Sequence, residues 1–287
     1  MTDLLDSIAA DRGRIADLVA DGRLDQAAYR SRHLADRNTA DPRAQADAAL
    51  VEWLRDTDLP RDRPAAWHDA FREGNLRAKD GSPTVVAAVR RYLARGLVKA
   101  SDTAGGRGGF LDAEPVGAYL LEAGLVDEAA ASLFASLARS PTSGRAALLL
   151  GNALHRLERV EEARDAYRRA LRTAPFEILL AEIEDEEVRG LADLADELGL
   201  EGDVRGWLPV IGYLEDVLPL SALDPVPGAG FGDATRAYDL LIAHKGARSH
   251  GERTAIRRDL KSVAPGLFDA LLVARKLDAA PPPSGNA

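Results

Sequence analysis

A run of carboxylates in the second half of the chain could bind a cation or a basic partner. Its members are Glu182, Glu184, Asp185, Glu186 and Glu187. Carboxylates at this density can attract a basic partner or a cation, but their spacing lacks the alternating ligands and central glycine of a calcium loop. The same residues suit the first turn of a helix, where acidic side chains face the positive end of the helix dipole. We therefore predict a solvated acidic helix start.

A basic cluster follows further along the chain. Its members are Arg253, Arg257, Arg258 and Lys261, which share one expected helix over residues 252–262. This cluster can complement the acidic run through ion pairs, either within one chain or between two copies. We expect pairing within the chain, and a homo-oligomer held by the acidic and basic helices is the alternative.

The sequence carries no recognised catalytic motif. The glycine-rich stretch at residues 105–109 lacks the Lys-Ser/Thr pair and the flanking strand of a phosphate-binding loop, and no Gly-x-Ser-x-Gly elbow is present. There is no cysteine, and the five histidines are scattered at His33, His68, His155, His244 and His250. His244 and His250 straddle an expected turn, but no carboxylate–histidine helix motif supports a metal site. We predict no catalytic residues, no metal and no cofactor.

Composition indicates an all-α protein. The formal net charge is −9, from 46 acidic and 37 basic residues, which disfavours nonspecific nucleic-acid binding because that needs a basic face. Hydrophobic residues make up 46% of the chain, with alanine, the best helix former, dominant among them. The N-terminus does not read as a signal peptide, and no window approaches the roughly 20 apolar residues of a membrane span. We expect a cytoplasmic protein without membrane contact.

Apolar periodicity and capping residues place the helices. Asp41 and Pro42 suit an N-cap and a first helical position. Gly22 is expected to close the first helix, and Gly96 lies near the expected end of another. Helices are expected at residues 4–20, 24–35, 42–54, 65–75, 83–96, 185–198, 207–218, 234–245 and 252–262, with a last one opening at Pro265.

Two consecutive blocks repeat one pattern at a spacing of 34 residues. The first block, residues 110–143, carries Val116, Gly117, Leu120, Gly124, Val126, Ala129, Leu133, Leu137 and Pro141. The second block, residues 144–177, carries Leu150, Gly151, Leu154, Glu158, Val160, Ala163, Tyr167, Leu171 and Pro175 at the matching positions. A fixed period in this range indicates a helical solenoid whose stacked units share a core. Each block is expected to hold two helices, the first ending near Gly124 or Glu158.

The second block closely resembles the tetratricopeptide repeat. The residues that carry the resemblance are Leu150, Gly151, Asn152, Ala153, Leu154, Ala163, Tyr167, Ala170, Leu171 and Pro175. The first block resembles it as well, through Gly117, Gly124, Ala129 and Pro141. Both blocks depart from the family by placing an alanine, Ala113 or Ala147, where a large aromatic is usual. The resemblance covers about a quarter of the chain and implies a short right-handed superhelix of α-hairpins with additional flanking helices.

The resemblance also implies a concave, partner-binding groove lined by the first helix of each hairpin. The matching positions are Leu111, Glu114, Ala118 and Leu121 in the first block, and Arg145, Leu148, Asn152, His155 and Arg156 in the second. The amide of Asn152 can bond a ligand backbone, and Arg145 and Arg156 can pair with a carboxylate. A solvated helix face is the alternative for each. The family's clamp for a C-terminal carboxylate is not expected, because Leu148 replaces its lysine and Glu114 repels an anion.

We expect five parts: an N-terminal helical region with diverged hairpins (1–100), a glycine-rich loop (101–109), two repeats (110–177), a C-terminal helical region (178–278) and a disordered tail (279–287). The flanking helices can either continue the superhelix or fill its groove. The predicted function is a non-catalytic scaffold or adaptor that binds a peptide segment of a protein partner in the groove. The alternative is an enzyme or small-ligand binder with a pocket at the loops 101–110 or 219–232.

Overall fold

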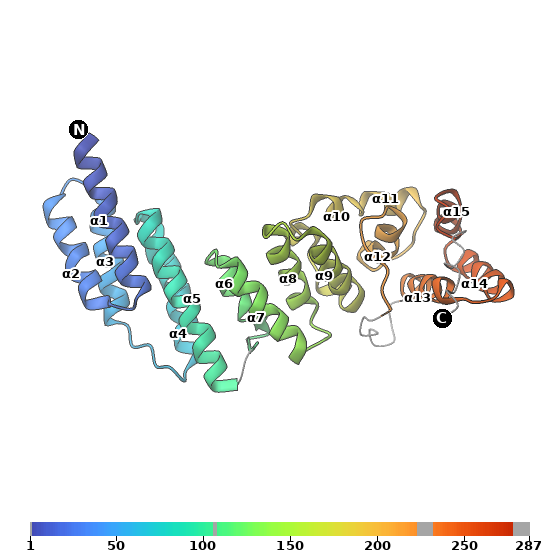
Figure 1. Cartoon of the computed structure of the whole chain (residues 1–287), viewed down its shortest axis with the longest axis horizontal. Coiled ribbons are helices and arrows are strands. Elements are labelled where there is room, and N and C mark those ends of the chain that lie inside the picture. Colours follow the sequence, from blue (N-terminus) through green and yellow to red (C-terminus); the bar gives the residue numbers. More distant parts are fainter. Residues whose placement is uncertain (1, 106–107, 223–231, 278–287) are drawn as a thin grey trace, which may run out of the picture. The chain divides into compact units, whose positions relative to one another are not determined.

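The computed structural model describes residues 2–105, 108–222 and 232–277 (Figure 1). The chain forms two compact units, residues 1–136 and 137–287, and their boundary falls inside helix α7. The described residues are overwhelmingly helical, which confirms the all-α prediction. None of the described helices is both long enough and apolar enough to cross a membrane. The expected tail and residues 223–231 of the expected loop lie outside the described part of the chain.

The first unit is a series of helix pairs with one short strand hairpin. Its elements are α1 (Thr2–Ala20), α2 (Leu24–Arg37), α3 (Pro42–Asp56), α4 (Pro64–Arg77), the 3-10 helix η1 (Ala78–Asp80), α5 (Pro83–Gly105), β1 (Phe110–Leu111), β2 (Glu114–Pro115), α6 (Gly117–Glu122) and α7 (Val126–Arg139). Helix α1 packs against α2 and α5, α2 packs against α3, and α4 packs against α5 (Figure 1). Aliphatic side chains such as Ile15, Val51 and Leu97 are fully buried between these helices.

Local capping chemistry sets several of these boundaries. Gly22 closes α1 with a left-handed backbone (φ +72°), and its N–H bonds the carbonyl of Val19. The side chain of Asp41 accepts a 3.0 Å hydrogen bond from the backbone N–H of Arg43 and so caps α3. Both caps are confirmed where the sequence predicted them.

Helix α5 continues past Gly96 to Gly105, which differs from the expected end of this helix. A β-carbon at Gly96 would lie 1.8 Å from the ring of Trp67 on α4. The glycine is therefore needed for the close approach of an aromatic ring and does not cap the helix. As a consequence, residues 101–105, which were expected to begin a loop, form the end of α5.

A buried carboxylate links three elements of the first unit. Asp47 on α3 is fully buried, and its Oδ1 accepts a 2.7 Å hydrogen bond from the backbone N–H of Ser82, just before α5. Its Oδ2 accepts a 3.1 Å hydrogen bond from Nε of Arg12 on α1. Because each partner comes from a different helix or helix start, this network fixes α1, α3 and α5 relative to one another.

The first helix of the first repeat begins later than expected, at Gly117. Residues 110–115 form an antiparallel strand hairpin in which Phe110 lies opposite Pro115. Asp112 and Ala113 turn the chain with positive φ angles of 50° and 70°. A proline at 115 lacks an N–H and restricts the residue before it to extended backbone, which opposes a helix over these residues.

The second unit contains the second repeat. Its elements after α7 are α8 (Gly144–Arg156), α9 (Val160–Thr173), the 3-10 helices η2 (Pro175–Glu177) and η3 (Leu180–Glu182), α10 (Glu186–Gly190), α11 (Asp193–Glu197), α12 (Val204–Leu214), α13 (Gly232–Gly246), α14 (His250–Val263) and α15 (Pro265–Val273). Helices α8 and α9 form a tightly packed hairpin, and α12 packs against both α9 and α13. The single acidic helix expected over residues 185–198 is in fact two short helices, α10 and α11.

Small residues allow the two helices of each repeat to approach closely. A β-carbon at Gly151 would lie 2.5 Å from the ring of Tyr167, and one at Gly117 would lie 2.7 Å from the side chain of Leu133. The turns between the helices pass through left-handed residues, Gly124 (φ +73°) and Glu158 (φ +60°). The two blocks therefore share the local hairpin geometry that their common spacing predicted.

Candidate functional site

One face of α8 is covered by the chain's own residues 178–188, which we call the acidic segment. The acidic segment includes η3 and the first turn of α10. Its apolar residues Ile178, Ile183 and Val188 are fully buried, while its carboxylates point toward arginines of the repeat. The C-terminal region thus fills this face of the second repeat.

Asn152 holds the backbone of the acidic segment. Its side chain is 5% exposed, and its Nδ2 donates a 2.8 Å hydrogen bond to the carbonyl of Glu182. Its Oδ1 accepts one hydrogen bond of 3.2 Å from the N–H of Glu184 and another of 2.8 Å from the hydroxyl of Tyr167. The intervening Ile183 has extended backbone, with φ −71° and ψ 121°. The amide therefore bonds the backbone on both sides of one extended residue, Ile183, and these partners belong to the chain itself; that Asn152 bonds the backbone of a protein partner stays a prediction.

Tyr167 on α9 supports the contact between Asn152 and the acidic segment. The side chain is fully buried on α9, and burial raises the pKa of its phenol above the ordinary value. The hydroxyl donates a hydrogen bond to Oδ1 of Asn152. This hydrogen bond fixes the orientation of the amide, so that its Nδ2 points at the segment's carbonyl.

Arginines of the repeat pair with the carboxylates of the acidic segment. Arg145 lies 2.6 Å from Glu182 and Arg156 lies 2.6 Å from Glu184, both from α8. The hydrogen bond to Glu184 also raises the pKa of Arg156. From α9, Arg164 contacts Asp185 at 3.2 Å. Charge-assisted pairs of this kind add a preference for acidic side chains to the sequence-independent backbone contacts.

The expected pairing between the acidic run and the basic helix is wrong for the described residues. The carboxylates of the run pair with the repeat instead, as given above. In the basic helix, Arg253 donates to the carbonyl of Ala247, and Arg257 donates to His244 and to the carbonyl of Leu277. The acidic run therefore contacts the second repeat, and the basic helix contacts residues of its own C-terminal region.

The remaining predicted groove residues are placed differently. Leu148 and Leu121 are buried in the core of their units, at 0% and 4% exposure. Glu114 and Leu111 were expected on a helix but lie on the strand hairpin, because Pro115 opposes a helix over these residues. His155 is partly exposed on α8, and its Nδ1 has no hydrogen-bond partner among the described residues. Only Arg145, Asn152 and Arg156 meet at one surface.

The sequence alone did not reveal what these three residues contact. Their partners are Glu182, Glu184 and Tyr167, and Arg164 on α9 adds a contact to Asp185 of the same segment. One signal was present: the apolar stretch Ile178–Ala181 is followed by Ile183 and Val188, which stand singly among the carboxylates of residues 182–187. This spacing fits neither a regular helix nor a strand, and it marks an irregular segment that buries isolated apolar side chains.

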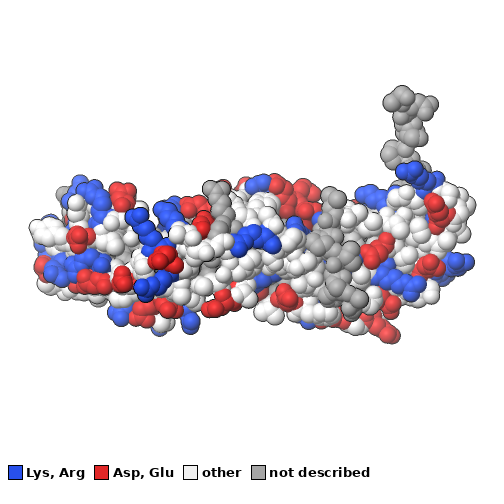
Figure 2. Space-filling view, turned by 90° about the horizontal axis from the view of Figure 1, so that it is seen from below, with Lys and Arg blue, Asp and Glu red and all other residues white. Residues whose placement is uncertain are grey.

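Charged side chains are intermixed on the face drawn in Figure 2, where acidic and basic residues lie close together over both units. Among the described residues, no group of three or more histidines and carboxylates is positioned to hold a metal ion. His244, considered above as a partner of His250, is buried and accepts a 3.3 Å contact from Nε of Arg257.

Comparison with known proteins defines the class of the central segment. Residues 117–178, from α6 to the start of the acidic segment, match the tetratricopeptide repeat family. No curated protein and no solved structure gives a significant match to the chain. The family match confirms the resemblance drawn from the two blocks. Repeats of this class serve in general as scaffolds for interactions with other proteins.

Proposed function

We propose that this chain is a non-catalytic interaction scaffold, and that α8 binds an extended acidic segment of a protein partner in exchange for the chain's own acidic segment. The observation that carries the proposal is the pair of hydrogen bonds from Asn152 to the backbone of residues 182 and 184. Backbone contacts of this kind accept many sequences, because every residue of an extended chain offers the same groups.

The side chains around Asn152 define the preferred ligand. In an extended chain, residues i and i+2 point to one side and the residue between them points to the other. Glu182 and Glu184 meet arginines of α8, while Ile183 between them is fully buried. A partner segment with an acidic–apolar–acidic pattern would make the same contacts.

The chain's own segment is a competitor of any partner. It is joined to α9 through η2 and so acts at an effective concentration on the order of millimolar. A free peptide of identical sequence should therefore bind weakly to the native chain and more tightly to a chain whose own segment is weakened.

The test is an anisotropy titration with a labelled peptide that copies residues 177–188. The receptors are the full-length chain and its variant Glu182→Lys/Glu184→Lys, which removes both carboxylates from the competitor. The variant should bind the peptide at least about tenfold more tightly than the native chain. Adding Asn152→Ala to the variant should abolish binding, and adding Arg43→Glu, an exposed change on α3, should leave it unchanged. A variant with native circular dichroism that does not bind the peptide contradicts the proposal.

A further inference from the structure

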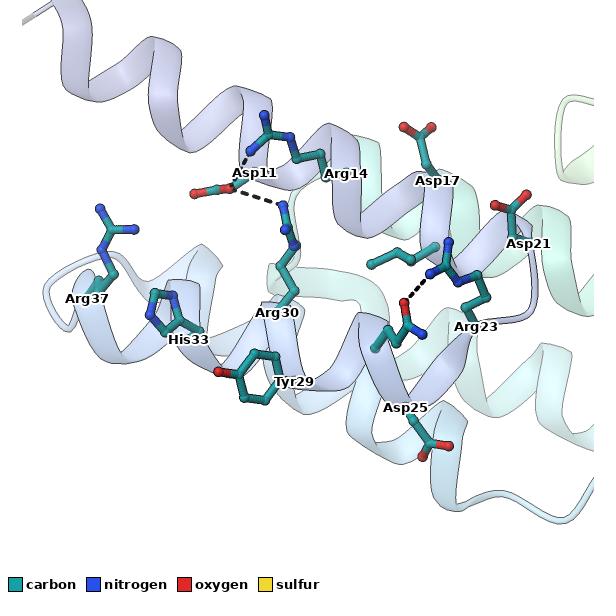
Figure 3. Close-up of a pocket in the computed structure, with 12 residues that line it drawn as sticks. Asp11, Arg14, Asp17, Asp21, Arg23, Asp25, Tyr29, Arg30, His33 and Arg37 are labelled. Atoms are coloured by element: carbon teal, nitrogen blue, oxygen red, sulfur yellow. Dashed lines mark hydrogen bonds and ion pairs between the residues drawn. The ribbon is translucent and has the colours of Figure 1, made fainter.

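We infer that a groove between α1 and α2 in the first unit is a second interaction site, which takes an extended peptide carrying acidic residues at one end and basic residues at the other. The groove has a volume of ≈ 840 Å³ (Figure 3). It lies far along the sequence from the acidic segment, within the first unit, and shares no residue with the face of α8.

The two ends of the groove carry opposite charge. Helices α1 and α2 form a hairpin, so residues near its turn lie together at one end and residues far from the turn lie at the other. Asp17, Asp21 and Asp25 outnumber one cation, Arg23, at the turn end, and Arg14, Arg30 and Arg37 outnumber one carboxylate, Asp11, from the middle of the groove to its open end, so the two parts differ in net charge (Figure 3). Such a groove favours a ligand whose basic end lies against the aspartates and whose acidic end lies against the arginines.

Several of these charges are not neutralised by the fold. In the described structure, the side chains of Asp17, Asp21, Asp25 and Arg37 make no hydrogen bond or ion pair. At the open end, Asp11 lies 3.7 Å from a guanidinium nitrogen of Arg14 and of Arg30 and so shares its charge between two arginines. Charged groups remain available at both ends for charge-assisted hydrogen bonds with a ligand.

An exposed aromatic residue stands between the two ends. Tyr29 is 75% exposed, and its ring stacks on His33 with centroids 6.5 Å apart and an interplanar angle of 26° (Figure 3). The contact with His33, itself exposed, leaves most of the ring in contact with solvent. An exposed aromatic surface of this kind suits a proline or a flat apolar side chain of an extended peptide.

The lining favours an extended peptide over a helix. A helix docks by burying an apolar stripe, whereas Tyr29 and Leu18 are the main apolar groups of this groove. From Asp25 to Arg37 the groove follows α2 for about 18 Å, at about 1.5 Å per residue. An extended chain covers that length with about five residues. The ligand's acidic and basic ends should therefore be about five residues apart.

The probes are labelled synthetic peptides with two glutamates and two lysines separated by a proline–alanine spacer of about three, five or seven residues. An isomer of each peptide, with the same composition but alternating charges, is the control ligand. Anisotropy titrations use the full-length chain at low ionic strength, where such contacts are least screened. The peptide with the middle spacer should bind saturably, and its alternating isomer should bind about tenfold more weakly.

Substitutions of exposed residues test where the peptide binds without disturbing the core. Tyr29→Ala, Arg37→Glu and Asp21→Lys should each weaken binding by about tenfold, and the exposed controls Arg43→Glu on α3 and Leu76→Ala on α4 should leave it unchanged. The inference is overturned if no spacer gives saturable binding, if the alternating isomer binds equally well, or if the three groove variants bind like the native chain. Because these residues are remote in sequence from the acidic segment, such a failure leaves the proposed role of α8 untouched.

Discussion

Nδ2 of Asn152 donates a 2.8 Å hydrogen bond to the backbone carbonyl of Glu182, thirty residues further along the chain. The same amide accepts a hydrogen bond from the N–H of Glu184, so one side chain fixes the backbone on both sides of Ile183, which is extended. A residue expected to contact a partner contacts the chain's own backbone instead. The stability of the second unit and its capacity to bind a partner therefore depend on the same amide.

Replacing Asn152 with alanine should destabilise the chain. The change removes three hydrogen bonds and leaves the buried hydroxyl of Tyr167 without its acceptor, which should lower the free energy of unfolding by about 2–4 kcal/mol. Urea denaturation measures the loss. Asn75→Ala is the control, because that partly exposed amide donates to Glu122 and accepts from Arg90 where water can replace both partners, and its loss should cost about 1 kcal/mol. Equal losses for the two variants would contradict the role given to Asn152.

Two glycines in helices should respond to alanine with opposite signs. At Gly96 a β-carbon would lie 1.8 Å from Trp67, so Gly96→Ala should destabilise by at least about 2 kcal/mol. At Gly13, in the middle of α1, nothing lies within 4 Å of the added carbon, and Gly13→Ala should stabilise by about 0.5–1 kcal/mol. Thermal melts of both variants test the difference in sign, and a neutral Gly96→Ala would show that Trp67 can move aside.

The buried carboxylate of Asp47 should matter far more than a surface carboxylate on the same helix. Asp47→Ala leaves Arg12 and the N–H of Ser82 without their acceptor in a buried site, at a cost of about 3–5 kcal/mol. Glu52→Ala removes the partner of Arg32 at the surface of α3, at a cost below about 1 kcal/mol. Urea midpoints of the two variants give the comparison. Similar midpoints would mean that water replaces the carboxylate of Asp47.

Tyr167 should make the chain less stable at alkaline pH. Burial raises the pKa of its phenol in the folded chain above the ordinary value of 10.0, which applies to the unfolded chain. As pH rises past 10, the unfolded state loses this proton first, so the contribution is intact below that pH and falls above it.

The corresponding measurement is the free energy of unfolding from urea titrations between about pH 9 and 11. Tyr167→Phe should show a shallower decline over this range than the native chain, although it is less stable at neutral pH because it lacks the hydrogen bond to Asn152. Tyr29→Phe, a change at an exposed residue, should decline like the native chain. Parallel curves for all three proteins would exclude a contribution from Tyr167.

The parts of the fold that rest on local chemistry could be predicted from the sequence. Gly22 closes a helix because glycine adopts a left-handed backbone readily, and Asp41 opens one because its carboxylate bonds a free N–H. The close approach at Gly151 also follows from residue size and the repeat spacing. Each of these features depends on neighbours along the chain or on a fixed period.

The rest depends on contacts between distant residues. Gly96 was expected near a helix end, but a glycine is needed there because the ring of Trp67 packs against it from another helix. The acidic run looked like a solvated helix start, but arginines on α8 and α9 hold it in an irregular conformation. Contacts between distant residues produce no periodic pattern in the sequence. The sequence could therefore indicate Arg145, Asn152 and Arg156 on α8, but not that the acidic segment covers them.

Native-state hydrogen exchange of the acidic segment tests most directly whether it can leave the face of α8. The informative probe is the amide of Glu184, which donates to Asn152, compared with amides inside α8 and α9 as urea is added below the unfolding transition. Exchange of Glu184 through a local opening, at a lower free energy and with a weaker urea dependence than the amides of α8, is the result we predict. Exchange of Glu184 only together with the amides of α8 and α9, at the same free energy, would contradict an exchangeable segment and make it a permanent part of the second unit.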